Sequence, residues 1–248
     1  MSAMSTNHDD LDGQTALVTG ATAGLGRAIA LQLARDGAEV IVHGRDPKRG
    51  AETVAAIHDE GGKARFVAAD LGDPAEIRHL ADEAGDVDVL VNNAGFSEWG
   101  PTESFDVDTF DGLFASNVRA PFYLVASFAP AMAARGSGSV VNIGSMAGSV
   151  GLPEGAAYGA TKAAIASLTR SWAAEFSASG VRVNTVAPGP IYTRPEARDL
   201  FDTLGASTAM NRAGQPQEIA EVVAFLASPR ASYVTGAIVA ADGGRTAI

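Results

Sequence analysis

The feature that most constrains this fold is an alternation along the chain: short β-branched runs, each followed by a glycine-containing turn and an alanine-rich amphipathic stretch. Val and Ile occupy both faces of the runs, so helices must cover each strand on both sides. The predicted strands are Thr15–Thr19, Glu39–His43, Ala64–Ala68, Val87–Asn92, Ser139–Gly144, Val181–Ala187 and Ala237–Ala241. The predicted helices are Gly24–Asp36, Pro47–Glu60, Pro74–Ala84, Val107–Arg135, Ala157–Ser179 and Gln217–Leu226.

This alternation predicts the α/β class, with a doubly wound, Rossmann-type seven-stranded parallel sheet that carries helices on both faces. No linker or repeat interrupts the series, so we expect one domain over residues 11–248, preceded by a flexible tail at 1–10. Residues 193–215 have few periodic apolar positions. Such a segment is either a substrate lid or a misread helix.

Composition excludes several classes of function. The 29 acidic and 18 basic residues leave a net charge of −11, which argues against nucleic-acid binding. The chain has no Cys, its four His lack metal-binding spacing, and no apolar run is long enough to span a membrane. The polar first ten residues do not resemble a secretory signal, so we expect a cytoplasmic protein without a metal.

A glycine-rich turn follows the first predicted strand. Gly20 allows a tight exit, Gly24 lets a pyrophosphate approach the backbone, and Gly26 permits close helix packing. Thr22 and Leu25 complete the turn. The spacing G-x-x-x-G-x-G differs from the general dinucleotide fingerprint, and a plain structural turn is the alternative. Its place in the first strand–helix unit favours dinucleotide binding.

The end of the second strand bears on which nicotinamide cofactor binds. Gly44 stands where a carboxylate would contact a ribose hydroxyl, and Arg45 offers donors suited to a 2′-phosphate. Asp46 competes as a ribose ligand, but it could equally cap the helix at Pro47. Arg45 could also be a solvated turn residue. We favour NADP(H), with NAD(H) as the alternative.

Two further turns are expected at the same edge of the sheet. Asp70 and Leu71 follow the third strand, where the carboxylate could accept from the adenine amino group. Asn93, Ala94 and Gly95 close the fourth strand and are expected to contact the cofactor. Asn92 is as well explained by a structural bridge between strands.

A phenol and an ammonium group, Tyr158 and Lys162, stand four residues apart and therefore on one helical face. A nearby cation lowers the pKa of a phenol, which then suits proton exchange with a carbonyl or an alcohol. Ser145 follows a strand and can donate to the same substrate oxygen. Asn117 lies inside a predicted helix without a capping role. The Tyr–Lys pair alone would be weak evidence.

Together these motifs resemble the single-domain short-chain dehydrogenase/reductase family from Leu11 to the C-terminus, and are similar to its 3-oxoacyl-[acyl-carrier-protein] reductases. The matching segments are TGATAGLG (19–26), NNAG (92–95), Asn117, Ser145, the Y-x-x-x-K motif (158–162), PGPIYT (188–193) and DGG (242–244).

The resemblance implies reversible hydride transfer between a nicotinamide and a small-molecule ketone or secondary alcohol. Tyr158 would be the general acid/base, Lys162 would hold the ribose, Ser145 would orient the substrate oxygen, and Asn117 would anchor a relay water. The nicotinamide would lie against Pro188, Gly189, Ile191 and Thr193. Relatives form homotetramers through the helix that carries Tyr158, so a homotetramer is expected.

Two departures narrow this expectation. Ala23 replaces a basic residue common in NADP-dependent relatives, and Ser179 replaces one typical of reductases that act on acyl carrier protein. Arg135 is the nearest substitute for the second. Because the chain is acidic, an acyl carrier protein partner is doubtful. An NAD-dependent sugar or polyol dehydrogenase and a non-catalytic redox sensor are the alternative functions.

Substrate contacts are expected from segments that follow the catalytic strands. The side chains of these segments suggest a mostly apolar site. Ordinary core or lid packing explains Phe201 and Leu204 better than substrate contact does. The candidates are Phe96, Trp99, Met146, Leu152, Tyr192 and the catalytic Ser145.

Overall fold

The computed structural model describes residues 10–248. The predicted tail at 1–10 lies outside the described residues except for Asp10, whose carboxylate forms an ion pair with Arg230 (2.8 Å). Within the described range, no helix combines the length and the apolar character needed to cross a bilayer.

Seven parallel strands form one sheet in the order β3-β2-β1-β4-β5-β6-β7. Consecutive strands add outward from β1 in one direction and from β4 in the other, which confirms the predicted doubly wound sheet and places its topological switch between β1 and β4. The strands are β1 (Thr15–Val18), β2 (Glu39–Gly44), β3 (Lys63–Ala68), β4 (Val89–Asn92), β5 (Gly138–Ile143), β6 (Val181–Pro188) and β7 (Ile238–Ala241).

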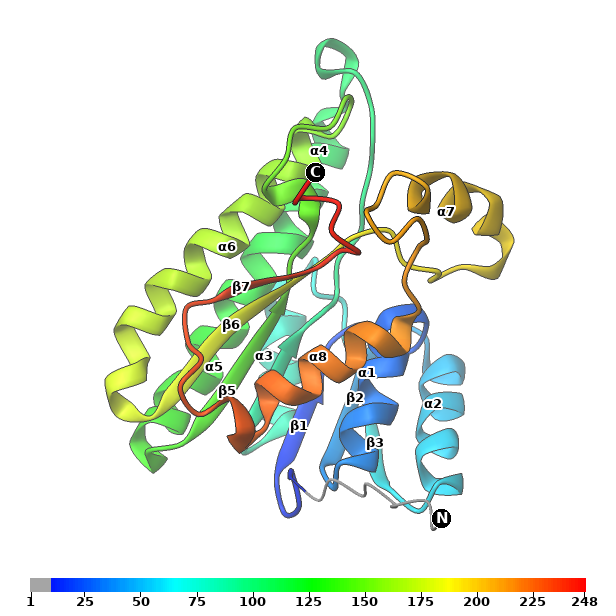
Figure 1. Ribbon diagram of the computed structural model, residues 1–248. Coiled ribbons are helices and arrows are strands. Elements are labelled where there is room, and N and C mark those ends of the chain that lie inside the picture. The colour runs from blue at the N-terminus through cyan, green and yellow to red at the C-terminus, as the bar shows by residue number, and fades with distance from the viewer. Residues whose placement is uncertain (1–9) are drawn as a thin grey trace.

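Helices cover both faces of the sheet (Figure 1). Helices α1, α2 and α8 lie on one face, and α3, α5 and α6 lie on the other. The α-helices are α1 (Gly24–Arg35), α2 (Pro47–Asp59), α3 (Pro74–Ala84), α4 (Val107–Phe114), α5 (Ala120–Arg135), α6 (Ala156–Phe176), α7 (Arg198–Gly205) and α8 (Pro216–Ala227).

The alternation of side chains along each strand divides the core in two. On β1, Ala16 and Val18 pack in the layer under α1 and α8, whereas Leu17 packs in the layer under α5. All three side chains are fully buried. Both layers are therefore apolar, which is why the strand runs are hydrophobic on both faces.

The predicted helix Val107–Arg135 is three segments in the structure. Helices α4 and α5 are joined by a π-helical turn, η2 (Ala115–Arg119), which contains Asn117. A π-turn inserts an extra residue into the helix and is common at functional sites. The chain is thus helical from Val107 to Arg135, as predicted, and the prediction missed the π-turn in the middle, which is held by the tertiary contacts of Asn117 described below.

The segment 193–215 contains one α-helix, α7, so the alternative of a misread helix describes part of it. Helix α7 lies beyond the carboxyl ends of the strands, at the upper right in Figure 1. The rest of the segment consists of turns and the short helix η5 (Pro195–Ala197). The proposed lid thus has its own helical element.

Candidate active site

A cleft of about 630 Å³ opens at the carboxyl ends of β1 to β4, beside the topological switch. Ligands of doubly wound sheets bind at this place. Eight predicted cofactor residues line the cleft, namely Gly20, Thr22, Arg45, Asp70, Leu71, Asn93, Ala94 and Gly95. The structure therefore brings residues from four separate turns to one site.

The glycine turn fits a phosphate-binding role by its shape. Gly20 and Gly24 have φ values of +64° and +52°, a conformation that favours glycine. A Cβ on Gly26 would lie 2.2 Å from the Gly20 carbonyl oxygen, so only glycine permits this packing. Helix α1 begins at Gly24 and has no side-chain hydrogen bond at its N-cap. Its first N–H groups are thus suited to a pyrophosphate.

His43 has a role that the sequence analysis did not assign. Its ring is 2% exposed at the end of β2. The Gly20 N–H donates to Nδ1 (3.2 Å), so the neutral ring carries its proton on Nε2, which donates to the Ala69 carbonyl (3.1 Å). Burial is the main reason why the pKa of His43 falls from 6.5 to about 4, although Asp70 raises it. His43 therefore joins the glycine turn to the end of β3.

Replacing His43 with Phe should weaken dinucleotide binding about tenfold, because a hydrogen bond to the turn is lost.

Neutral His43 stabilises the fold above pH 6.5, and this contribution is lost as the pH falls toward 4. Between pH 7 and pH 5 the wild type should therefore lose about 2 kcal/mol more unfolding free energy than His43→Phe. Urea denaturation measures this difference. Equal pH dependence in both proteins would contradict this expectation. His79→Phe is the control, because His79 is an exposed residue of α3.

The structure explains why no carboxylate stands at position 44. A Cβ on Gly44 would lie 2.5 Å from Cγ2 of Thr22, so a larger side chain there would require Thr22 to move. Arg45 is exposed and lines the cleft together with Arg49, which the sequence analysis missed. Asp46 caps α2 through the N–H groups of Lys48 and Arg49 (2.9 and 3.3 Å) and also forms an ion pair with Arg49 (2.9 Å). Asp46 is therefore a helix cap in the structure, as one of the two sequence-based interpretations expected.

The turn after β4 is held by the residues that follow β1. The hydroxyl of Thr19 accepts hydrogen bonds from the N–H groups of Asn93 and Ala94 (both 2.9 Å). The side chain of Asn93 donates to the carbonyls of Thr19 (2.8 Å) and Gly20 (3.2 Å). These bonds fix the NNAG turn against the glycine turn.

Two polar residues at this edge have structural contacts. The side chain of Asn92 donates to Asn142 on β5 (2.9 Å). Asn92 therefore bridges two strands, which is the structural alternative that the sequence offered. Asp70, expected near the adenine, accepts from the Gly72 N–H (2.9 Å) and orders the turn after β3. Asp70 nevertheless lines the cleft.

Tyr158 lies in the first turn of α6, beside the end of β5. Burial raises the pKa of its phenol, and the nearby hydroxyl of Ser145 partly offsets this effect. Ser145 itself accepts from the Ala147 N–H (3.1 Å). A phenol with a raised pKa is protonated at neutral pH, so Tyr158 is ready to act as an acid beside a hydroxyl donor.

Lys162 lies one turn further along α6 and is 8% exposed. Its ammonium donates to the Ile143 carbonyl (2.9 Å) and lies 5.7 Å from the centroid of the Tyr158 ring. Burial lowers the pKa of Lys162 to about 8, which leaves it mostly charged at pH 7. The sequence analysis expected Lys162 to lower the pKa of Tyr158. In the structure burial raises the pKa of the phenol, and the group that lowers it is Ser145 rather than Lys162.

Asn117 is buried within the π-turn. Its amide nitrogen donates to the Phe96 carbonyl (2.9 Å) and to the Thr161 hydroxyl (3.1 Å), and its oxygen accepts from the Phe96 N–H (3.1 Å). Asn117 therefore joins the loop after β4 to α6. A Cβ on Gly95 would come within 2.5 Å of the Asn117 oxygen, so this loop requires glycine.

The remaining cofactor candidates lie on β6 and the loop after it. Ile191 pairs with Gly214, and a Cβ on Gly189 would meet Asp242 at 2.8 Å. Thr193 lies beside Gly24, since a Cβ on Gly24 would be 3.4 Å from the carbonyl oxygen of Thr193. Pro188 ends β6. Thus the loop after β6 reaches the glycine turn.

The substrate candidates divide into two groups. The ring of Trp99 lies 5.8 Å from that of Tyr158, centroid to centroid, and Met146 begins the short helix after Ser145. Tyr192 instead contacts α7, because its hydroxyl donates to Asp202 and its ring packs on Phe201 (6.1 Å). Phe96 is 43% exposed and lines the cleft, and Leu152 lies next to Gly155.

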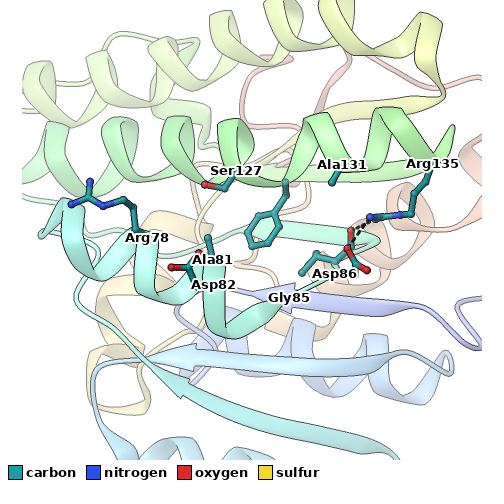
Figure 2. A pocket seen from close by; sticks show the side chains of 10 residues that line it. Arg78, Ala81, Asp82, Gly85, Asp86, Ser127, Ala131 and Arg135 are labelled. Carbon is teal, nitrogen blue, oxygen red and sulfur yellow. Dashed lines mark hydrogen bonds and ion pairs between the residues drawn. The ribbon is translucent and has the colours of Figure 1, made fainter.

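Another hollow, of about 350 Å³, lies between α3 and α5 (Figure 2). It is at the amino end of β4, far from the edge that carries the catalytic candidates. Arg135 at one end donates to Asp86 (3.2 Å) and to the Val87 carbonyl (2.7 Å). The guanidinium of Arg135, which the sequence offered as a possible contact for acyl carrier protein, is therefore bonded within this chain. Among residues 10–248, no group of side chains could hold a metal ion.

A cleft at the carboxyl edge of a doubly wound sheet suits a dinucleotide cofactor, and the relatives show the class of the protein, an NAD(P)-dependent oxidoreductase acting on CH–OH groups. A family model described as enoyl-(acyl carrier protein) reductase matches residues 20–246. The chain belongs to the short-chain dehydrogenase/reductase family.

Individual relatives support this membership. The chain is 41% identical over 244 residues to cis-4-hydroxycyclohexanecarboxylate dehydrogenase of Sinomonas cyclohexanicum, covering 95% of this chain and 97% of that protein. A solved structure described as a short-chain dehydrogenase/reductase family protein is 51% identical, with a TM-score of 0.92 over 96% of this chain and 100% of that one. Gluconate 5-dehydrogenase of Burkholderia cenocepacia J2315, solved with NADP and tartrate, is 32% identical, with a TM-score of 0.91 and 98% of both chains covered.

Proposed function

We propose that the protein interconverts a secondary alcohol and a ketone with NADP(H), and that Tyr158 is the general acid/base. The observation that carries this proposal is that the phenol of Tyr158 lies close to the hydroxyl of Ser145, at the sheet edge where the dinucleotide cleft lies. Two hydroxyl donors at one point suit an oxygen that gains negative charge during reduction.

The role proposed for each residue is the one that its resemblance to the family implies. A bound nicotinamide would supply or accept the hydride. The glycine turn would hold the phosphates of the cofactor, and Lys162 would hold its ribose through the buried ammonium. Ser145 orients the substrate oxygen, and Oη of Tyr158 gives it a proton during ketone reduction. In alcohol oxidation the phenolate takes that proton back. Asn117 anchors the water that returns the proton to solvent.

Two features support a preference for NADP(H). The space at Gly44 is filled by Thr22, which removes the usual place for a ribose-binding carboxylate. Arg45 lines the cleft and is exposed, whereas the neighbouring Arg49 is paired with Asp46. A guanidinium matches the geometry of a phosphate. The gluconate dehydrogenase relative was solved with NADP.

The substrate is proposed as a small molecule with a secondary hydroxyl. One relative is named for a hydroxycyclohexane substrate and another for gluconate. The second name favours a sugar or polyol dehydrogenase as the second candidate function. An acyl carrier protein stays a doubtful partner, because Arg135 is bound within its own chain.

A substrate panel tests this function. Purified protein is given NADPH or NADH with cyclic ketones, open-chain ketones and sugar ketones, and cofactor absorbance reports turnover. We expect turnover with NADPH on at least one simple ketone. Cofactor binding without turnover on any compound would instead favour the redox sensor, and turnover of sugars with NADH alone would favour the second candidate.

We further propose a homotetramer. Phe122 and Tyr123 on α5 are 44% and 51% exposed, and Phe110 on α4 is 42% exposed. Large exposed aromatic residues on one side of a chain are typical of an interface. Light scattering of the purified protein tests the proposal through its mass. A cytoplasmic location and a lid function of residues 193–215 stay predictions from the sequence.

A further inference from the structure

An indole covers one side of the catalytic tyrosine. Trp99 comes from the loop between β4 and α4, yet its ring lies 5.8 Å from the Tyr158 ring, with an angle of 48° between their planes. The Trp99 side chain is still 43% exposed. A large apolar surface is therefore offered to solvent beside the phenol.

The position of this indole depends on a glycine. A Cβ on Gly155 would lie 2.6 Å from Cζ3 of Trp99, so the ring occupies the space that a side chain would fill. The Gly100 N–H also donates to the Glu154 carbonyl (3.0 Å). Glu154 has a φ of +62°, an uncommon value for a residue with a side chain. The loops after β4 and β5 are thus joined immediately beside Trp99.

The other end of the Trp99 loop is fixed as well. Both backbone groups of Phe96 are bonded to the side chain of buried Asn117. The loop is therefore held on both sides of Trp99, which makes the indole a preformed surface. A preformed surface binds best those ligands that lose little freedom on binding.

We propose that Trp99 determines substrate specificity by selecting ring-shaped secondary alcohols and ketones over open-chain ones. The inference rests on the proposed function and adds the shape of the substrate. A rigid ring presents a flat face of C–H groups to the indole without loss of rotamer freedom. An open chain of equal carbon number must order several torsions to make the same contact.

The test compares kcat/KM for cyclohexanone and for 2-hexanone, with NADPH, in variants of this wall. Trp99→Ala should lower the value for cyclohexanone about tenfold and that for 2-hexanone about twofold or less. Trp99→Phe, which keeps an aromatic face, should retain most of the preference. Gly155→Ala should act like Trp99→Ala, because its Cβ displaces the indole. Gly151→Ala is the matched control, since its Cβ would meet nothing within 4 Å.

A binding measurement gives a second readout. Cyclohexanol should change indole fluorescence in the wild type with NADP⁺ bound, and this change should be absent from Trp99→Phe, which retains only buried Trp172. Equal losses on both ketones, or no loss on either, would overturn the selection while leaving the proposed function intact. A wild type that turns over no ketone at all would overturn the proposed function, and the selection with it.

Discussion

Tyr158→Phe is expected to lower kcat for ketone reduction about 10³-fold, with the affinity for NADPH unchanged. The substitution removes one oxygen atom and keeps the ring that packs against Trp99. The substrate then lacks its proton donor, while the cleft between Gly20 and Asp70 is untouched. Steady-state kinetics and a cofactor titration measure the two quantities separately.

The pH dependence of the reverse reaction adds to this test. Burial raises the pKa of Tyr158, so phenolate is scarce at neutral pH. Alcohol oxidation needs the phenolate, and its rate should rise as the pH rises toward that pKa. The rise should be absent from Tyr158→Phe. Tyr233→Phe serves as the control because Tyr233 is fully exposed. Retained turnover in Tyr158→Phe would remove the acid/base role.

Arg45→Ala is expected to weaken NADPH binding about 10- to 100-fold while NADH binding stays the same. Charged hydrogen bonds to a phosphate account for a loss of this size. Arg49 compensates little, because its guanidinium is bound to Asp46 (2.9 Å). Cofactor titration of both proteins with both cofactors measures the change.

Lys48→Ala is the matched control for Arg45→Ala. It removes a positive charge three residues away, from an exposed side chain that does not line the cleft. It should therefore affect the two cofactors alike and weakly. Equal losses of NADPH and NADH binding in Arg45→Ala would contradict the proposed contact with the 2′-phosphate.

The sheet was predictable from the sequence because its information is local. Runs such as Ala16–Val18 are apolar on both faces, and the structure shows that each face enters a separate buried layer. The sheet order and the edge at which the turns meet then follow from the alternation of strands and helices.

The contacts that refine the site were not predictable, since they join residues distant in sequence. Asn117 bonds Phe96 and Thr161 and thereby holds a π-turn in what the pattern predicted as one helix. His43 ends an otherwise apolar strand, and only the fold brings Gly20 and Ala69 to its two nitrogens. In the sequence, a polar residue at the end of an otherwise apolar run was the one signal that could have indicated the role of His43.

A crystal structure of the protein grown with NADP⁺ tests the central claim most directly. We expect the dinucleotide to extend from Arg45 across the glycine turn, with its pyridine ring beside the hydroxyls of Tyr158 and Ser145. A pyridine ring turned away from those hydroxyls, or a dinucleotide bound outside the cleft at the carboxyl ends of β1 to β4, would contradict it.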